Sequence, residues 1–239
     1  MEYANGNGTG LDFAISRFVS IRIAEGIYFD ITSTTISMMV ATLLLLILGI
    51  AVNVKSKNWK PEDKPSGLQN LIEMLVNAFQ GFFRGSASEK LDHLQPWFFT
   101  LFAFLLVGNM IGVVGLRPPT GDWSVTFPLA LASFILFQYA GLRYRPKNYL
   151  KGFLQPVFIF LPLNLLGEFA RPIALSFRIF GNVLGGFVLL SLLYGLAPIF
   201  VRPLFPVALH MYFDIASGFL QAFIFTVLSL TFVGLAAED

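Results

Sequence analysis

Four charged side chains lie within stretches of the sequence that are otherwise apolar enough to cross a membrane: Glu168, Arg171, Arg178 and Asp214. A charged group at the centre of a bilayer costs about 2.5 to 3.5 kcal/mol on insertion scales, so each of these positions calls for a functional or pairing role. Arginine keeps its proton in a protein, whereas a carboxylate can bind and release a cation. One permanent cation between two carboxylates therefore indicates ion passage across a membrane.

The first of the two charged segments places its polar residues on one helical stripe. Arg171 and Arg178 are seven positions apart, so their directions around a helix differ by only about 20°. Small residues beside such a stripe let a neighbouring helix approach closely. The stripe carries two asparagines and lies next to a pair of glycines: Asn164, Asn182, Gly181 and Gly185.

The second charged segment also carries a polar stripe on an otherwise apolar helix. Its members stand at i, i+4, i+7, i+8 and i+11: His210, Asp214, Ser217, Gly218 and Gln221. Asp214 is nearer the outer end of its segment and Glu168 nearer the inner end of the other, with Arg178 between them in depth. This layout predicts two partial polar paths, one from each side of the membrane, separated by a fixed cation.

Structural roles for the same residues remain open. Glu168 and Arg171 are at i and i+3, so they can form an ion pair with no further function. Asp214 can simply neutralise Arg178 across the two segments, and His210 can be an anchor at the membrane surface. Two amides in other segments, Asn109 and Gln138, are expected to form hydrogen bonds between helices rather than to bind ions.

Composition tells us which elements must position these residues. Of the 239 residues, 56% are hydrophobic, only 13% are charged and 27 are phenylalanine; a soluble domain has roughly 25% charged residues. These values exclude a soluble domain, a disordered chain and a nucleic-acid-binding protein. The chain has no cysteine, and no metal site, cofactor or catalytic signature is expected.

The predicted fold class is an all-α integral membrane protein with about five transmembrane helices and one interfacial amphipathic helix. A spanning helix needs about 20 apolar residues. The last two segments are longer, so they are expected to form a steeply tilted or bent hairpin, with Pro162 and Pro172 as possible bends. The predicted spans are 34–54, 96–116, 125–142, 156–196 and 203–235.

The rest of the chain is expected to belong to the same single membrane domain, 1–239. Residues 67–85 alternate apolar and polar positions with a helical period, which predicts an amphipathic helix in the membrane interface; a soluble helix packed beneath the membrane domain is the alternative. Residues 1–33 are expected to be an external segment without a cleavable signal peptide.

The distribution of basic residues predicts the orientation of the chain in the membrane. With the N-terminus outside, ten of the sixteen Lys and Arg residues lie in inner segments and four in outer ones. Because basic residues accumulate in cytoplasmic segments, we expect the N-terminus outside and the C-terminus in the cytoplasm.

Two C-terminal motifs resemble those of a known family, subunit a of the F-type ATP synthases. The stretch GEFARPIALSFRIFGNVLGG at 167–186 is similar to the family signature, with Arg178 in the place of its essential arginine. QAFIF at 221–225 is similar to a motif of the family's last helix. Weaker similarities, in family order, are GLQNLIE at 67–73, GNMIG at 108–112 and PPTGDWSVTFPLAL at 118–131.

The resemblance implies a stator that translocates ions and is not itself catalytic. Ions would enter one half-channel, neutralise a carboxylate on a rotating ring of c subunits, and leave by the other half-channel. Arg178 would pair with each ionised ring carboxylate, beside Gln221. Asp214, with His210 and Ser217, would belong to the outer half-channel. Glu168 would lie near the inner one, and Asn164 and Asn182 are included in the predicted ion pathway. Small residues would face the ring: Gly181, Gly185 and Gly218.

The resemblance also implies partners and a location. These are the c-ring, the peripheral-stalk b subunits, the remaining ATP synthase subunits, the lipid bilayer and a transported proton or, as the alternative, a sodium ion, in a bacterial plasma membrane. One position departs from the family, which often has Glu or His nine residues after the arginine, where this chain has Phe187. Other classes that the residues allow are an autonomous channel, a secondary transporter and a membrane scaffold without transport.

Overall fold

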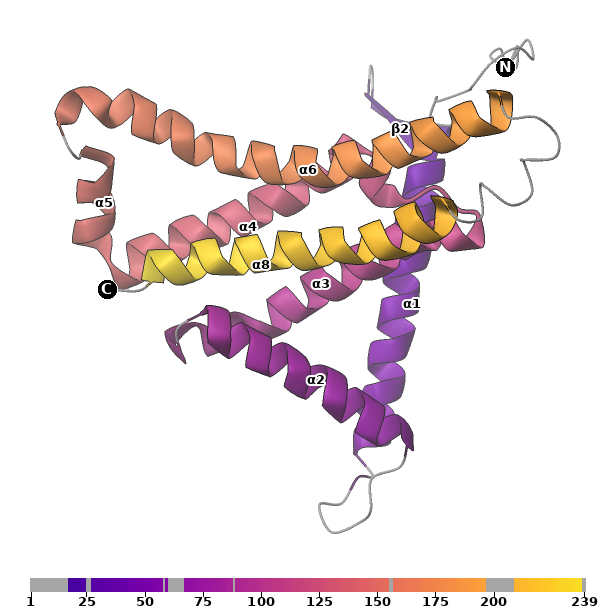
Figure 1. Ribbon diagram of the computed structural model, residues 1–239, viewed down its shortest axis with the longest axis horizontal. Helices are drawn as coiled ribbons and strands as arrows, with labels where there is room; N and C mark the ends of the chain where they lie inside the picture. The colour runs from indigo at the N-terminus through magenta and orange to yellow at the C-terminus, as the bar shows by residue number, and fades with distance from the viewer. Residues whose placement is uncertain are drawn as a thin grey trace.

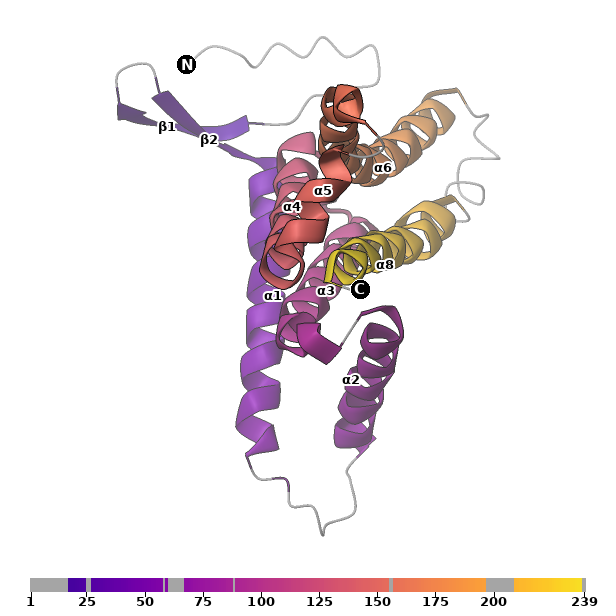
Figure 2. The same cartoon turned by 90° about the vertical axis from the view of Figure 1, so that its left-hand side faces the viewer.

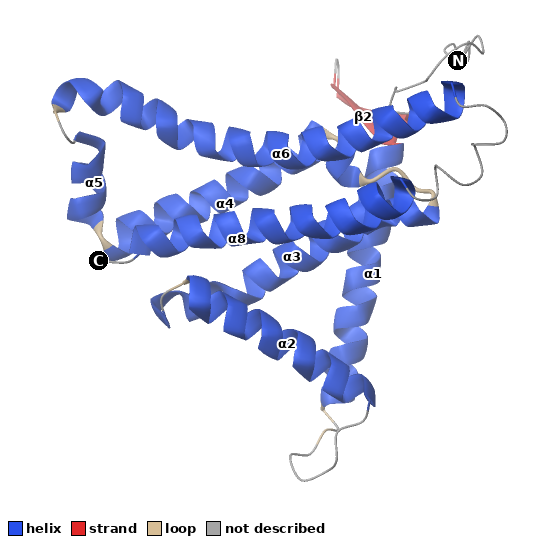
Figure 3. Ribbon diagram, in the orientation of Figure 1, coloured by secondary structure: helices blue, strands red, loops and turns tan. Residues whose placement is uncertain are grey.

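Five helices in the described part of the chain are long and apolar enough to cross a membrane. This finding, from a computed structural model, confirms the predicted all-α membrane fold, and Figure 3 shows how little of it is not helical. The structure describes residues 17–24, 27–57, 59, 67–87, 89–154, 157–196 and 209–237. The five helical stretches are Ser33–Ser56, Glu89–Val114, Trp123–Tyr144, Phe158–Leu190 and Met211–Ala237.

A short β-hairpin precedes the first spanning helix. Strands β1 (Arg17–Ala24) and β2 (Ile27–Thr32) pair antiparallel and lead directly into α1 (Ser33–Ser56). The Thr32 hydroxyl accepts a hydrogen bond of 3.2 Å from the amide of Thr35, which caps the start of α1. The sequence pattern did not predict the hairpin within the segment 1–33, of which residues 1–16 lie outside the described part.

The spanning helices are arranged in three layers, as Figures 1 and 2 show. Helices α3 (Gln95–Met110) and α4 (Trp123–Tyr144) form the middle layer, with α1 on one side of it. Helices α6 (Leu161–Leu196) and α8 (Gly218–Ala237) lie on the other side. Helix α4 packs against both α6 and α8, and α3 packs against both α1 and α8. The middle layer therefore sets the positions of the two charged helices.

Helix α6 is longer than a bilayer core is thick, which is the property from which a steep tilt was predicted. Its 36 residues correspond to about 54 Å of helix, well beyond the thickness of a bilayer core, and in Figure 1 α6 and α8 run crosswise to α1. Pro172 lies inside α6, and Pro162 occupies its first turn, where proline is tolerated. The short helix η4 (Phe158–Phe160) precedes it. The predicted link between the last two helices, 197–202, and the predicted helix start at 203 lie outside the described residues.

Two shorter helices have amphipathic sequences. Helix α2 (Gly67–Ser86) buries Phe79 and Phe83 near its C-terminal end, while Leu71 and Leu75 nearer its start are exposed. The short helix η1 (Glu89–Leu94) connects it to α3. Helix α5 (Pro146–Leu154) follows α4 and precedes η4. An exposed apolar stripe on α2 is what a helix lying in the membrane interface requires.

Two irregular segments shape the end of the molecule opposite α5. Helix α3 continues into η2 (Ile111–Val114), which ends at Gly115, whose φ of 82° is in the left-handed region that favours glycine. The turn η3 (Pro119–Gly121) then leads to α4. Ahead of α8, the segment η5 (Met211–Ser217) is a π-helix. Because a π-helical turn holds more residues than an α-helical turn, it changes which residues share a face.

Candidate functional site: two cavities and an arginine between them

Arg178 is exposed on α6 and forms no ion pair or hydrogen bond with any residue that the structure describes. It lies inside a helix long and apolar enough to span a membrane. The alternative in which Asp214 neutralises Arg178 is not supported, since the carboxylate of Asp214 pairs with His210. An arginine without a partner among the described residues is costly within a membrane-spanning helix, so its exposed position calls for an explanation.

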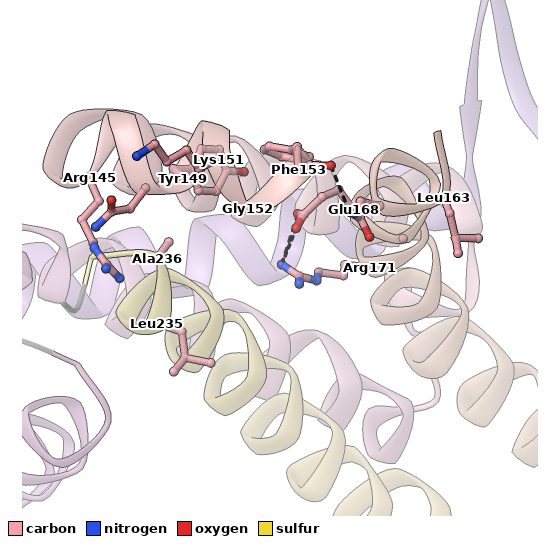
Figure 4. Close-up of a pocket in the computed structure, with 13 residues that line it drawn as sticks. Arg145, Tyr149, Lys151, Gly152, Phe153, Leu163, Glu168, Arg171, Leu235 and Ala236 are labelled. Carbon is pink, nitrogen blue, oxygen red and sulfur yellow. Dashed lines mark hydrogen bonds and ion pairs between the residues drawn. The ribbon is translucent and has the colours of Figure 1, made fainter. Parts of the chain in front are cut away.

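A cavity of about 720 Å³, the α5 cavity, lies beside the N-terminal part of α6. Its walls come from α5, from α6 and from the end of α8, as Figure 4 shows. Glu168 and Arg171 point toward each other at its side, and their atoms Oε1 and Nη1 are 3.1 Å apart. Asn164 also lines the cavity and donates a hydrogen bond of 2.9 Å to the carbonyl of Phe153.

Arg171 has different surroundings from Arg178, although the two lie close on a helical wheel. Its guanidinium carbon lies 4.9 Å from the ring centre of Phe137 on α4 and 5.3 Å from that of Phe232 on α8. With Glu168 it forms the expected i, i+3 ion pair. Arg171 is therefore satisfied within the chain by a carboxylate and two aromatic rings, whereas Arg178 forms no ion pair with a described residue.

A second cavity, of about 250 Å³, lies beside the C-terminal part of α6 and η5; we call it the η5 cavity. His210 and Asp214 line it, and their atoms Nδ1 and Oδ2 are 2.7 Å apart. Gly112 on η2 makes room for this pair, because a Cβ at that position would lie 3.1 Å from the Asp214 carboxyl group. Only 13% of the Asp214 side chain is exposed.

The η5 cavity contains one cation that the sequence pattern did not single out. Arg117, between η2 and η3, lines the cavity with its guanidinium carbon 5.4 Å from the ring centre of Phe187. The similarity to the family had drawn attention to Phe187 but not to Arg117. Arg117 and Phe187 come together because the loop between η2 and η3 brings residue 117 back over α6.

The remaining polar residues of the predicted pathway divide into two kinds. Asn182 on α6 donates a hydrogen bond to the hydroxyl of Ser217 on η5, so this pair links the two elements. Gln221 on α8 has a buried Oε1 that accepts no hydrogen bond from the described residues. Asn182 and Ser217 thus bond to each other, whereas Gln221 retains an acceptor that no described residue uses.

The three small residues predicted to face a ring do not behave alike. A Cβ at Gly181 or Gly185 would meet nothing within 4 Å, so this face of α6 is open. For Gly218 the prediction is wrong: the residue is buried, and a Cβ there would lie 3.0 Å from the Cβ of Asn109. Because Gly218 follows the π-helical turn, it does not take the direction that regular helical spacing assigns to it.

The two predicted interhelical amides are confirmed. Asn109 donates a hydrogen bond of 3.0 Å to the carbonyl of Gly218 and accepts one from the hydroxyl of Thr120. Gln138 on α4 accepts a hydrogen bond from the hydroxyl of Tyr149 on α5. Burial raises the pKa of the Tyr149 phenol to about 12, and the negative charge of Glu168 acts in the same direction.

The fold and the site together define a class of protein. It is an integral membrane protein in which a long helix presents an exposed arginine, without an ion pair among the described residues, between two cavities. The cavities are lined on α6 by residues from 163 to 171 and from 183 to 190, respectively.

Comparison with known proteins places this class in a family. The family model described as ATP synthase A chain matches residues 35–234, and the chain belongs to that family. The chain is thus a membrane subunit of the ion-translocating sector of a rotary ATP synthase, and not its catalytic subunit.

Relatives from bacteria and chloroplasts span most of the chain. It is 35% identical over 211 residues to ATP synthase subunit a 2 of Picosynechococcus sp., covering 87% of this chain and 88% of the relative. It is 33% identical over 232 residues to the sodium ion specific ATP synthase subunit a of Propionigenium modestum, covering 90% and 77%. It is 28% identical over 247 residues to the chloroplastic subunit a of Oedogonium cardiacum, covering 98% and 96%.

Proposed function

We propose that the two cavities are the two half-channels of an F-type ATP synthase stator, and that Arg178 separates them. Ions would reach a ring carboxylate from one cavity and leave the next carboxylate through the other. The observation that carries this proposal is the exposed side chain of Arg178, which lies between the cavities and forms no ion pair with any described residue. A permanent cation favours the ionised form of a carboxylate, so each ring carboxylate would release its ion before passing Arg178.

The face of α6 around Arg178 suits the approach of another helix. Exposed or open small residues continue the stripe in both directions along the helix, at spacings of three and four: Ala170, Ala174, Gly181 and Gly185. Such residues let helix backbones come close in a membrane. We propose that this face contacts the c-ring and that Arg178 is the one charged group within the contact. Gln221, with its unused acceptor, is the residue of α8 that we assign to the same site.

We propose that the transported ion is a proton. In the η5 cavity one oxygen of Asp214 is already occupied by His210 at 2.7 Å, and the cavity is also lined by the cation Arg117. A sodium ion needs several free oxygen ligands, whereas a carboxylate and an imidazole in contact can pass a proton. His210 would thus supply the relay partner that Phe187 does not provide. Sodium remains the alternative, since a relative that covers most of this chain is named as sodium ion specific.

A groove on the opposite side of the middle layer suits a further partner. A cavity of about 620 Å³ lies between α1 and the pair α3 and α4, and Gly49, Thr42 and Thr100 are among its lining residues. We propose that a transmembrane helix of a peripheral-stalk b subunit occupies it, with the remaining subunits assembling around this unit. The proposed orientation is N-terminus outside and C-terminus cytoplasmic, in a bacterial plasma membrane, so the α5 cavity would open to the cytoplasm.

Thiol labelling from each side of the membrane tests this proposal. The chain has no cysteine, so Asn148→Cys in the α5 cavity and Leu116→Cys at the η5 cavity each introduce one thiol. The assembled enzyme would be labelled in right-side-out and inside-out vesicles with a membrane-impermeant reagent. We expect each thiol to be labelled from one side only, and the two from opposite sides.

A lipid-facing control gives the background of this assay. Ile47 on α1 is exposed in the structure, so Ile47→Cys should be labelled from neither side if α1 faces lipid or a partner helix. Labelling of Asn148→Cys and Leu116→Cys from the same side would contradict the two-half-channel arrangement.

A further inference from the structure

Tyr149 attaches α5 to α4 at the α5 cavity. Its ring occupies the space that a side chain at Gly141 on α4 would need, because a Cβ there would lie 2.6 Å from Cδ2 and 2.7 Å from Cε2 of Tyr149. Distances below 3.0 Å are not tolerated by real Cβ atoms. The ring can therefore lie at this place only if residue 141 is glycine.

Further contacts fix the orientation of the same ring. The hydroxyl donates a hydrogen bond to Oε1 of Gln138, one turn before Gly141 on α4. The ring meets Phe137 edge-on at a centroid distance of 6.0 Å and Phe153 at 5.1 Å. Gln138, Phe137 and Gly141 of α4 therefore hold a side chain whose backbone belongs to α5, and Phe153 of α5 packs against the same ring.

The contacts of Tyr149 matter to the cavity because α5 supplies much of its wall. Asn148, Tyr149, Lys151, Gly152 and Phe153 all line the α5 cavity, opposite Glu168 on α6. Figure 4 shows this helix lying across the cavity from the ion pair of Glu168 and Arg171. If α5 moved away from α4, the distance across the cavity and the access of water to Glu168 would change.

The phenol has the right chemistry for a fixed polar wall. Its neighbours with charge are the residues that line the cavity around it: Arg145, Lys151, Glu168 and Arg171. Since its pKa is about 12, the hydroxyl stays protonated throughout the physiological range. It remains a donor to Gln138 and keeps its lone pairs available to water in the cavity.

We propose that Tyr149 is a positioning residue of the α5-side ion pathway: docked on Gly141 and Gln138, it holds α5 in place as the wall through which ions reach Glu168. This inference rests on the proposed function, because it takes the α5 cavity to be an ion pathway. Tyr149 acts through the position of α5 and not by carrying the ion.

The test compares three variants in the assembled enzyme. Tyr149→Leu removes the ring, Gly141→Ala displaces it, and Tyr149→Phe removes only the hydroxyl. Tyr139→Leu is the matched control, since Tyr139 is on the same helix as Gln138 but is 49% exposed. Assembly is checked on native gels, so that only complexes with a full subunit complement are compared.

Two measurements distinguish an effect of Tyr149 on the position of α5 from a general loss of stability of the complex. The first is the labelling rate of Gly167→Cys, a position on α6 that lines the α5 cavity. The second is ATP-driven proton pumping while the pH is varied on one side of the vesicle at a time. A loss of general stability would change neither the labelling rate within intact complexes nor the pH dependence on one side alone.

We expect Tyr149→Leu and Gly141→Ala to change the labelling rate at residue 167 and to lower pumping, each by at least about fivefold. The pH dependence should shift only on the side to which the α5 cavity opens. With Tyr149→Phe, the labelling rate of Gly167→Cys should stay within about twofold of the rate measured with Tyr149 present. This variant should also pump faster than Tyr149→Leu, because its ring still packs against Gly141. Tyr139→Leu should match the wild type in both measurements.

Some results would overturn the inference without touching the proposed function. If Gly167→Cys is labelled normally from the expected side but Tyr149→Leu and Tyr149→Phe both behave as the wild type, Tyr149 does not position the pathway. If Tyr149→Leu pumps as well as Tyr149→Phe, docking of the ring is not what matters. If Gly167→Cys is labelled from the opposite side or from neither, the assignment of the cavity itself, and thus the proposed function, is wrong.

Discussion

Gly185 and Gly186 are neighbours in the sequence with opposite surroundings, so a methyl group added to each should have opposite effects. A Cβ at Gly186 would lie 2.8 Å from Cδ1 and 2.9 Å from Cγ of Phe213 on η5. A Cβ at Gly185 would meet nothing within 4 Å. Because Cγ lies on the axis of the Cβ–Cγ bond, rotation of the Phe213 ring about that bond cannot relieve the 2.9 Å contact.

The size of the effect at Gly186 follows from the geometry. Ordinary contact begins at 3.4 Å, so α6 and η5 would have to separate by about 0.6 Å, and overpacking of this kind costs about 1–3 kcal/mol. The hydrogen bond between Asn182 and Ser217 joins the same two elements and would be stretched. For a chain of this length each kcal/mol corresponds to about 2–4 °C in unfolding temperature.

The assay is thermal inactivation of ATP-driven pumping by membrane vesicles that carry the assembled enzyme. We expect Gly186→Ala to lower the inactivation temperature by several degrees. Gly185→Ala, and Gly181→Ala as a second control, should leave it unchanged but lower the pumping rate, since their methyl groups point to the proposed ring contact. If Gly186→Ala is as heat-stable as the wild type while Gly185→Ala is not, the faces of α6 are assigned the wrong way round.

Three further predictions concern single side chains. Asn109→Leu should lower the thermal inactivation temperature, because loss of the buried amide costs about 1–3 kcal/mol; unchanged heat stability would show that its two hydrogen bonds contribute nothing. Asp214→Asn should slow pumping by at least about tenfold and His210→Gln by less, because in the proposed relay the Asp214 carboxylate would be the primary proton carrier; equal or reversed effects would contradict the relay. The native phenol of Tyr149 has a pKa of about 12 against 10.0, so its contribution to stability is complete below pH 10 and is lost as the pH rises through 12. The difference in heat stability between wild type and Tyr149→Phe should accordingly be constant below pH 10 and shrink above it.

The spanning helices and the charged residues within them could be predicted because both are visible in the order of residues along the chain. Runs of about 20 apolar residues define spans, and a charge inside such a run stands out without knowledge of its partners. Arg178 and Asp214 were found in this way. The ion pair of Glu168 with Arg171 also needs only the helical spacing between them.

What sequence reasoning missed depends on departures from regular spacing. The π-helical segment η5 changes the direction of the residues that follow it, which is why Gly218 is buried against Asn109 and does not face outward. Hydrophobic periodicity assumes 3.6 residues per turn and cannot register such a change. The polar run around Asp214 inside an apolar helix was the only local signal of an irregular turn.

The other omissions are contacts between residues far apart in the chain. Arg117 reaches Phe187 because the loop after η2 folds back over α6, and Tyr149 reaches Gly141 because α5 turns back onto α4. In each case one partner is an aromatic residue or a glycine, types that are abundant in this sequence. Their pairing therefore gives no signal before the fold is known.

Arg178→Ala tests the central claim most directly. The measurement is ATP-driven ion pumping by membranes carrying the assembled variant enzyme, with and without sodium in the buffer, and with assembly verified on native gels. If Arg178 separates two half-channels, pumping is lost while the complex still assembles; if the transported ion is a proton, the wild-type rate does not depend on sodium. Pumping by the assembled variant at the wild-type rate would contradict the account.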